Sequence, residues 1–132
     1  CPTHVRIIPE HIERMRSRHP EAKVMVHPEC RPDVTRMADQ VLSTGGMCRF
    51  VQDSPGGEFI VGTETGLLER LRREHPGKRF YPATEAAVCP NMKRTRIETL
   101  LWSLQDGVHV VTVPQETAAK AKKAIERMLE IT

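Results

Sequence analysis

The chain has 132 residues, of which 39% are hydrophobic and 28% charged, and its formal net charge is +3. This composition is typical of one globular domain or slightly more, and it excludes an intrinsically disordered chain. The basic excess is small, and one Trp, one Tyr and three Phe leave little to stack on bases. We therefore expect no binding to nucleic acid.

We recognise neither a membrane-spanning segment nor a signal peptide in this sequence. No apolar run approaches the roughly 20 residues of a membrane-spanning helix. The opening residues Cys1-Pro2-Thr3-His4 lack the basic and then apolar pattern of a signal peptide. We expect a cytoplasmic protein without membrane association. Because the first residue is Cys and not Met, the chain is either processed or a fragment of a longer protein.

Helical and strand patterns alternate along the chain. In chain order they predict helix 9–18, strand 23–26, helix 32–38, strand 41–42, a turn at 54–57, strand 59–61, helix 67–74, strand 79–81, helix 95–104, strand 108–113 and helix 114–129. Short strands that alternate with helices predict a parallel sheet covered by helices, which is an α/β fold. Two of the helices end in the same way, at His19-Pro20 and His75-Pro76, and indicate two successive helix–strand units.

Chemistry-bearing residues follow the predicted strands, at the sheet edge where α/β proteins bind ligands. After strand 23–26 come His27, Pro28 and Glu29. A histidine can donate to a substrate carboxylate and a glutamate can move protons. The alternative is an ordinary loop in which Glu29 and Pro32 only open the next helix.

Two glycine-rich segments also follow strands. Ser43 and Thr44 precede Gly45-Gly46, and residues 62–66 read Gly-Thr-Glu-Thr-Gly. Hydroxyls and exposed backbone N–H groups can hold an anion at a helix N-terminus. Alternatively, both segments are capped turns, with Thr63 or Thr65 capping the helix that follows.

The four cysteines stand at positions 1, 30, 48 and 89 and form no CxxC pair. This spacing argues against a zinc ribbon, a thioredoxin motif or a disulfide framework. Cys89 precedes a helical pattern, and a helix N-terminus favours the thiolate that ligates metals; a buried free cysteine is the alternative. Cys1 and Cys89 are each followed by proline, a pairing that recurs at iron–sulfur ligands.

Taken in order, five segments resemble the quinolinate synthase family: Cys1-Pro2-Thr3-His4, Val26-His27-Pro28-Glu29-Cys30, Ser43-Thr44-Gly45-Gly46-Met47, Gly62-Thr63-Glu64-Thr65-Gly66 and Cys89-Pro90-Asn91-Met92-Lys93. The resemblance extends through Thr112-Val113-Pro114 to the last helix. It implies an enzyme of de novo NAD biosynthesis that condenses iminoaspartate with dihydroxyacetone phosphate to quinolinate, phosphate and water.

The resemblance also implies a 4Fe–4S cluster held by three cysteines, with its fourth iron open as a Lewis acid. Cys1 and Cys89 match two of these ligands. Glu29 matches the catalytic acid–base residue, His27 and Pro28 belong to the same substrate-binding motif, and Ser43 and Thr44 match residues that hold substrate oxygens. Cys48 is interpreted as a buried, inert thiol. Cys30 is interpreted as a packing residue, with a substitute cluster ligand as the alternative.

For the whole protein, the resemblance implies three pseudo-symmetric three-layer α/β domains, each giving one cysteine to the cluster. Residues 1–89 would be the third domain. Residues 90–132 would be a strand–helix segment that packs toward the first domain. The N-terminal half, with the third cysteine, has no counterpart here, so we expect this chain alone to be inactive. The rival interpretation is a stand-alone α/β module that binds an anionic metabolite without catalysis.

Overall fold

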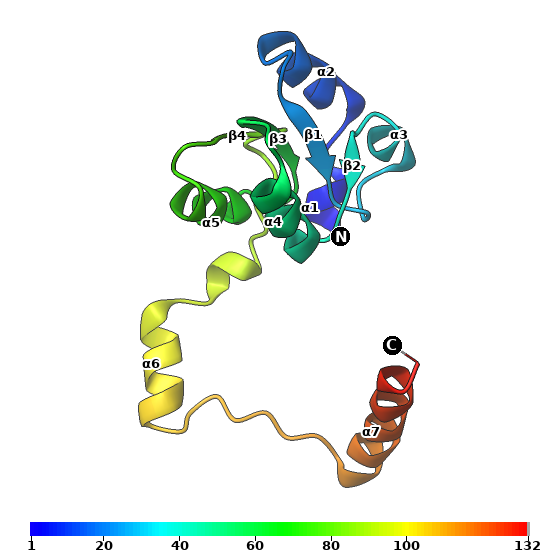
Figure 1. The fold of residues 1–132 in the computed structure, drawn as a ribbon. Coiled ribbons are helices and arrows are strands. Elements are labelled where there is room, and N and C mark those ends of the chain that lie inside the picture. The colour runs from blue at the N-terminus through cyan, green and yellow to red at the C-terminus, as the bar shows by residue number, and fades with distance from the viewer. Residues whose placement is uncertain (132) are drawn as a thin grey trace. The chain divides into compact units, whose positions relative to one another are not determined.

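The computed structural model describes residues 1–131, and the chain forms two compact units (Figure 1). The first unit runs from Cys1 to Met92, and the second begins at Lys93. Nearly all of the packing between helices and strands lies in the first unit. This unit also contains every residue that the sequence analysis predicted for catalysis or binding.

A four-stranded parallel sheet forms the centre of the first unit, in the order β2-β1-β3-β4. Its strands are β1 (Lys23–Val26), β2 (Gln40–Val41), β3 (Glu58–Gly62) and β4 (Arg79–Pro82). This confirms the predicted α/β fold with a parallel sheet. Val26 lies opposite both Val41 and Gly62, so β1, β2 and β3 all end at one edge of the sheet.

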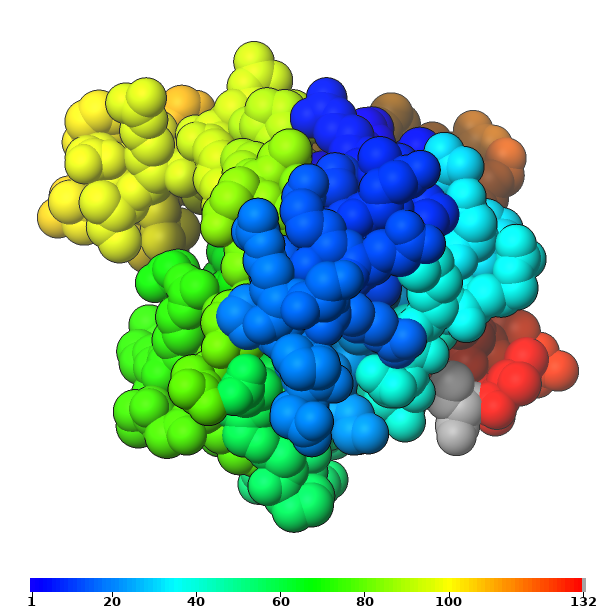
Figure 2. Space-filling view, turned by 90° about the horizontal axis from the view of Figure 1, so that it is seen from above, coloured from blue at the N-terminus to red at the C-terminus, as the bar shows by residue number. Residues whose placement is uncertain are grey.

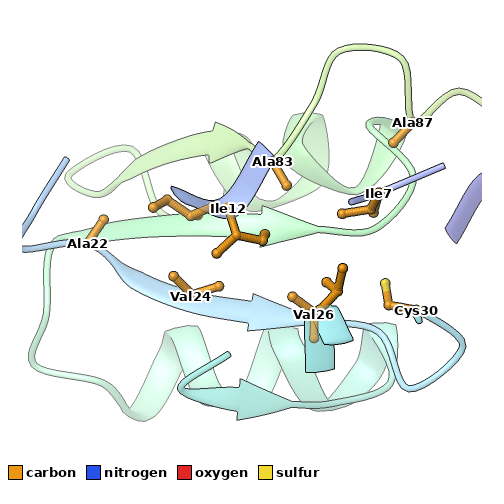
Figure 3. Close-up of a cluster of buried hydrophobic side chains, with 10 residues drawn as sticks. Ile7, Ile12, Ala22, Val24, Val26, Cys30, Ala83 and Ala87 are labelled. Carbon is orange, nitrogen blue, oxygen red and sulfur yellow. The ribbon is translucent and has the colours of Figure 1, made fainter. Parts of the chain in front are cut away.

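Helices cover both faces of the sheet, because side chains along a parallel strand point alternately to opposite faces. One core lies under α2 (Pro9–Arg18) and α3 (Pro32–Thr35), and it includes Val24 and Val26 of β1 (Figure 3). The other lies under α4 (Thr44–Asp53) and α5 (Gly66–Glu74), and it includes Met25. The first unit is therefore a three-layer α/β/α sandwich.

The two His-Pro breaks end their helices in nearly identical conformations. His19 closes α2 at φ −136° and ψ 70°, and His75 closes α5 at φ −134° and ψ 68°. In each, the histidine N–H still donates to the carbonyl four residues back. The proline that follows cannot continue the helix, so the chain turns directly into β1 or β4.

Two helices of the first unit were not predicted. They are α1 (Pro2–Val5) and α4, whose first turn contains Gly45 and Gly46. The sequence had suggested an anion-binding helix start or a capped turn here, without the extent of the helix. Gly46 is buried, and a Cβ there would lie 3.2 Å from the Cβ of Leu42. Gly46 thus permits α4 to pack closely on the chain that leads into it.

Helix α3 is shorter than predicted, ending at Thr35 instead of Ala38. The chain leaves the helix because Asp39 must reach the sheet. Its backbone N–H donates to the Val24 carbonyl at 2.9 Å, and its carboxylate accepts from the Val24 N–H at 2.7 Å. Tertiary hydrogen bonds thus override a local helical pattern.

The second unit contains two helices, α6 (Ile97–Gln105) and α7 (Gln115–Leu129), preceded by a short 3₁₀ turn, η1 (Met92–Arg94). The predicted strand over 108–113 is wrong, because these residues form no regular structure, and Val110 and Val111 are 75% and 85% exposed. A strand needs a neighbour to pair its backbone groups, and no strand of residues 1–131 pairs with this segment. The α/β class stands, but its C-terminal segment is helical only.

Within residues 1–131, none of the helices combines the length and apolar character needed to cross a membrane.

Candidate active site at the C-terminal ends of β1 and β3

The strand order creates a crevice at one edge of the sheet. From β1 the chain passes through α3, on one face of the sheet, to β2 on one side of β1. From β3 it passes through α5, on the other face, to β4 at the opposite side of the sheet. Because β1 and β3 are neighbours, their carboxyl ends form the switch point at which open α/β sheets bind ligands. His27 follows β1 directly, and Thr63 follows β3.

Helix α1 places His4 beside the carboxyl ends of β1 and β3. His4 is buried; its Nδ1 lies 2.9 Å from Glu29 Oε2, and its Nε2 lies 2.9 Å from Thr63 Oγ1. Its ring stacks on that of His27, with 4.2 Å between centroids and 8° between planes. Three segments distant in sequence thus meet around one imidazole.

The network favours an ionised Glu29 and a neutral His27. The hydrogen bond from His4 lowers the pKa of the Glu29 carboxyl. Burial, and then the neighbouring His4, lower the pKa of His27. His4 Nδ1–H therefore donates to the Glu29 carboxylate, which leaves Nε2 to accept from the Thr63 hydroxyl. Because a hydroxyl both donates and accepts, Thr63 can also serve a protonated His4.

The two cysteines predicted as ligands are both tied to α1. Cys1 caps the helix, and its sulfur lies within 4.8 Å of a ring nitrogen of His4 and a carboxylate oxygen of Glu29. Cys89 is half-buried, and backbone N–H groups of Met92 and Asn91 together with the Thr3 hydroxyl lower the pKa of its thiol. Figure 2 shows the dark-blue N-terminal residues beside the yellow-green segment near residue 90.

A buried carboxylate holds the Cys89 loop against α5. Glu64 Oε1 accepts from the Cys89 N–H at 3.3 Å, and Oε2 accepts from the Gly66 N–H at 2.7 Å. Glu64 therefore caps α5. The sequence had offered Thr63 or Thr65 for this role, but Thr63 instead bonds His4, and Thr65 makes no side-chain cap.

Three other predicted residues surround the crevice. Pro28 is exposed in the turn that carries His27 to Glu29. The Ser43 hydroxyl accepts from the Gly46 N–H at 3.2 Å and caps α4. Thr44 lines a cavity of about 280 Å³ together with Thr63, Glu64, Gly66, Leu67, Arg70 and Met92. The register of β1 with β2 brings these residues to the same sheet edge as His27.

The remaining cysteines pack against the cores. Cys30 is 6% exposed, its thiol donates to the Gly62 carbonyl at 3.5 Å, and burial raises its pKa to about 11. The packing role predicted for Cys30 is confirmed. Cys48 of α4 is half-buried beside the second core, so it is less enclosed than expected.

Sequence reasoning gave no individual role to His4 or Thr3, and it offered Thr63 only as part of a possible anion-binding segment or as a helix cap. A signal for His4 was present, since Cys1 and His4 are three residues apart and lie on one face of a helix. The signal was usable only with α1 recognised as a helix. Nothing local indicates that Thr3 faces Cys89, because that contact joins residues 86 positions apart.

Comparison with known proteins gives one consistent result. A family model described as "Quinolinate synthetase A protein" (NadA) matches residues 1–130. The chain is 49% identical over 131 residues to the quinolinate synthase of Thermodesulfovibrio yellowstonii, covering 99% of this chain and 43% of that protein. It is 52% identical over 132 residues to that of Dehalococcoides mccartyi strain 195, covering 100% of this chain and 44% of that protein.

An archaeal relative, quinolinate synthase 1 of Methanosarcina acetivorans, is 49% identical over 131 residues, again covering 99% of this chain and 43% of the relative. The chain thus spans less than half the length of these curated relatives. The family model nonetheless matches almost every residue of it, and the chain belongs to the quinolinate synthetase A family.

Proposed function

We propose that this chain supplies part of the active site of a quinolinate synthase, which condenses iminoaspartate with dihydroxyacetone phosphate to give quinolinate, phosphate and water in NAD biosynthesis. One observation carries the proposal: α1 joins Cys1, His4, Glu29 and, through Thr3, Cys89 at the switch point of the sheet. Proteins named quinolinate synthase are about half identical to this chain throughout its length.

In this proposal Cys1 and Cys89 hold two irons of a 4Fe–4S cluster. Their surroundings fit thiolate ligands, because N–H and O–H donors lower the pKa of Cys89 and Cys1 is exposed at the same helix. Cys30 does not fit, since burial holds its thiol protonated. We assign the third ligand to the part of the relatives that these 132 residues do not span. When bound, such a cluster with one open corner supplies a Lewis acid for substrate oxygens.

Glu29 acts as the acid–base residue. Its side chain is 53% exposed, and its lowered pKa keeps it ionised and ready to accept a proton from substrate carbon. The Nδ1–H of His4 fixes one carboxylate oxygen and stabilises its charge. The other oxygen remains available to the substrate.

His27 binds a substrate carboxylate. Its Nδ1 accepts from the Glu29 N–H at 3.2 Å, so the neutral ring carries its proton on Nε2 and can donate it to an anion. Pro28, between them, sets the turn that gives this bond. Ser43 and Thr44 bind further substrate oxygens, because the Ser43 hydroxyl proton and the first N–H groups of α4 are donors at the same sheet edge.

We further propose that residues 1–89 are one of three pseudo-symmetric domains and that residues 90–132 pack against another part of the enzyme in the cytoplasm. Exposed apolar residues on α6 and α7 support such packing, Leu104 and Leu129 among them. The partners would be the domains absent from this chain, and the chain alone would make no quinolinate.

A chimera tests this proposal. The chain replaces the matching region of the Thermodesulfovibrio yellowstonii enzyme, and the protein is purified without oxygen and loaded with iron and sulfide. We expect quinolinate formation and one cluster per chain. Cys89→Ser should abolish cluster and turnover, whereas Glu29→Gln should retain the cluster and lose turnover.

Cys48→Ser serves as the matched thiol control and should retain both properties. The isolated 132-residue chain should bind little iron and make no quinolinate. A stoichiometric cluster with turnover in the isolated chain, or full activity in the Cys89→Ser chimera, would contradict the proposal.

A further inference from the structure

We propose that Cys1, His4 and Glu29 also form a mononuclear site for a divalent ion such as zinc, which shares only Cys1 with the proposed cluster. One sulfur, one imidazole nitrogen and one carboxylate oxygen lie within 4.8 Å of one another. Among the described residues 1–131, these are the three His, Cys, Asp or Glu side chains that lie close enough together to share an ion. The inference does not rest on the proposed function, because it needs neither Cys89 nor any segment outside this chain.

The donor set suits zinc. Zinc takes thiolate, imidazole and carboxylate ligands at about 2.0–2.3 Å, so tetrahedral ligand atoms lie roughly 3.3–3.6 Å apart. A pair of ligand atoms at the 4.8 Å limit must therefore approach by roughly 1.2–1.5 Å. Cys1 and Glu29 can supply this movement, because their side chains are 31% and 53% exposed, whereas His4 is held in place. Three protein ligands leave a fourth position for water.

Thr63 provides the outer partner that a metal-bound histidine needs. Zinc would take His4 Nδ1, the nitrogen that now faces Glu29, and the ring proton would move to Nε2. Nε2–H then donates to Thr63 Oγ1, which lies 2.9 Å away and is buried. Metal-ligating histidines almost always donate their second N–H to such a group, which fixes the tautomer.

The hydroxyl and stacking contacts of the His4 ring preserve this geometry without the ion. The ring is fixed by His27 on one face and by Thr63 at its far nitrogen. The ion would replace only the His4–Glu29 hydrogen bond, and two anionic ligands would balance its charge. Because Cys1 serves both sites, zinc and a cluster would exclude each other at this residue.

Cobalt titration tests the proposal. The 132-residue chain is expressed with a short peptide ahead of Cys1, so that the amine of residue 1 is an amide and cannot bind the ion. After treatment with a chelator and reductant, it is titrated with Co²⁺ and then with Zn²⁺. We expect one Co²⁺ per chain with a sulfur-to-cobalt charge-transfer band, which stoichiometric Zn²⁺ removes.

Variants identify the ligands. Thr63→Val should weaken binding about 10- to 100-fold, and Thr63→Ser should restore it, as expected for an outer-shell partner. Cys1→Ala should remove the charge-transfer band, and Glu29→Gln should weaken binding by more than the Thr63→Val change. Cys89→Ser and Cys48→Ser should bind Co²⁺ as the unchanged chain does. Circular dichroism of each variant verifies that the sheet is retained.

The comparison of Cys1 with Cys89 separates this inference from the proposed function. Equal loss of the cobalt band in Cys1→Ala and Cys89→Ser would mean that the two thiols act together, and it would overturn the mononuclear site. Unchanged affinity in Glu29→Gln, or no sulfur-to-cobalt band in the starting protein, would overturn it as well. None of these results bears on whether the chimera makes quinolinate.

Discussion

The two units of this chain contain similar amphipathic helices but use them differently. In the first unit, α4 and α5 bury Met47, Val51, Leu68 and Leu71 against the sheet. In the second, no residue from Lys93 to Ile131 is buried. Its large apolar residues remain on the surface, including Ile97, Leu100, Leu101, Trp102, Leu104, Ile125, Met128 and Leu129. A helical apolar stripe becomes a core only when a complementary surface covers it.

The difference also explains what stabilises each helix. Helix α7 relies on local pairs such as Lys120 with Glu116 at 2.6 Å and Lys122 with Glu126 at 3.7 Å. Such exposed pairs contribute only a few tenths of a kcal/mol each. Helices of the first unit gain stability from burial, which contributes about 1.5–3 kcal/mol for each large apolar side chain. We therefore expect the first unit to unfold cooperatively and the second to make little contribution to that transition.

The largest expected effect comes from truncating the core. Phe59 is fully buried between Phe50 and Phe80, with ring centroids 6.1 and 5.6 Å away. Phe59→Ala should lower the free energy of unfolding by about 3–5 kcal/mol, because it removes buried contacts and leaves a cavity. Urea denaturation followed by circular dichroism measures this change.

Leu129→Ala in α7 is the matched control. Leu129 is 65% exposed, so its truncation should change the unfolding free energy of the first unit by less than about 0.5 kcal/mol. Comparable losses for the two variants would break the distinction between the units, because they would show Leu129 to be part of the same cooperative core.

A pair of glycines gives a smaller effect. Gly62 ends β3, and a Cβ there would lie 2.7 Å from Cγ1 of Val26. Gly62→Ala should destabilise the first unit by about 1–3 kcal/mol through overpacking. Gly107 lies between α6 and α7 at φ +62° with open space around it. Gly107→Ala should strain that loop by about 1–2 kcal/mol without moving the unfolding midpoint of the first unit.

Thermal unfolding, followed through the circular dichroism signal of the sheet, distinguishes these outcomes. A midpoint that falls equally in both glycine variants would mean that strain near Gly107 reaches the first unit, contrary to the proposed independence.

Labelling of the thiols should leave stability unchanged, and its rate should show which cysteines the core encloses. At pH 8, a pKa of about 11 leaves roughly one Cys30 thiol in a thousand ionised, and the side chain is also buried. The lowered pKa of Cys89, near the boundary of the units, favours its thiolate. Iodoacetamide should therefore label Cys89 well before Cys30, as measured by mass spectrometry of the digested chain. Faster labelling of Cys30 would contradict the enclosed position of that thiol.

The same shift has a stability consequence with a definite sign. Cys30 has its ordinary pKa of 9.0 when unfolded and about 11 when folded, so the folded state favours the protonated thiol. The contribution of this pKa shift to the free energy of unfolding is complete below pH 9 and is lost as the pH rises toward 11. Cys30→Ala should flatten the decline of stability across that window.

Most of the first unit was predictable from local pattern. The apolar runs at 23–26 and 59–61 correctly predicted β1 and β3, and the breaks at Pro20 and Pro76 correctly predicted where α2 and α5 end. Hydrophobic periodicity and proline geometry are local properties, so they survive without tertiary information. The strand predicted over 108–113 failed because pairing depends on a partner, which no local pattern supplies.

The candidate site divides in the same way. Local pattern was enough to show which residues follow the strands, since His27 and Glu29 come after the buried run of β1, and Ser43 and Thr44 come after the short strand β2. Tertiary packing alone brings His4 to Glu29 and Thr63, and Thr3 to Cys89. These contacts close loops of 25 to 86 residues. They form because α1 covers the sheet edge where β1 and β3 end, an arrangement set by packing and not by sequence spacing.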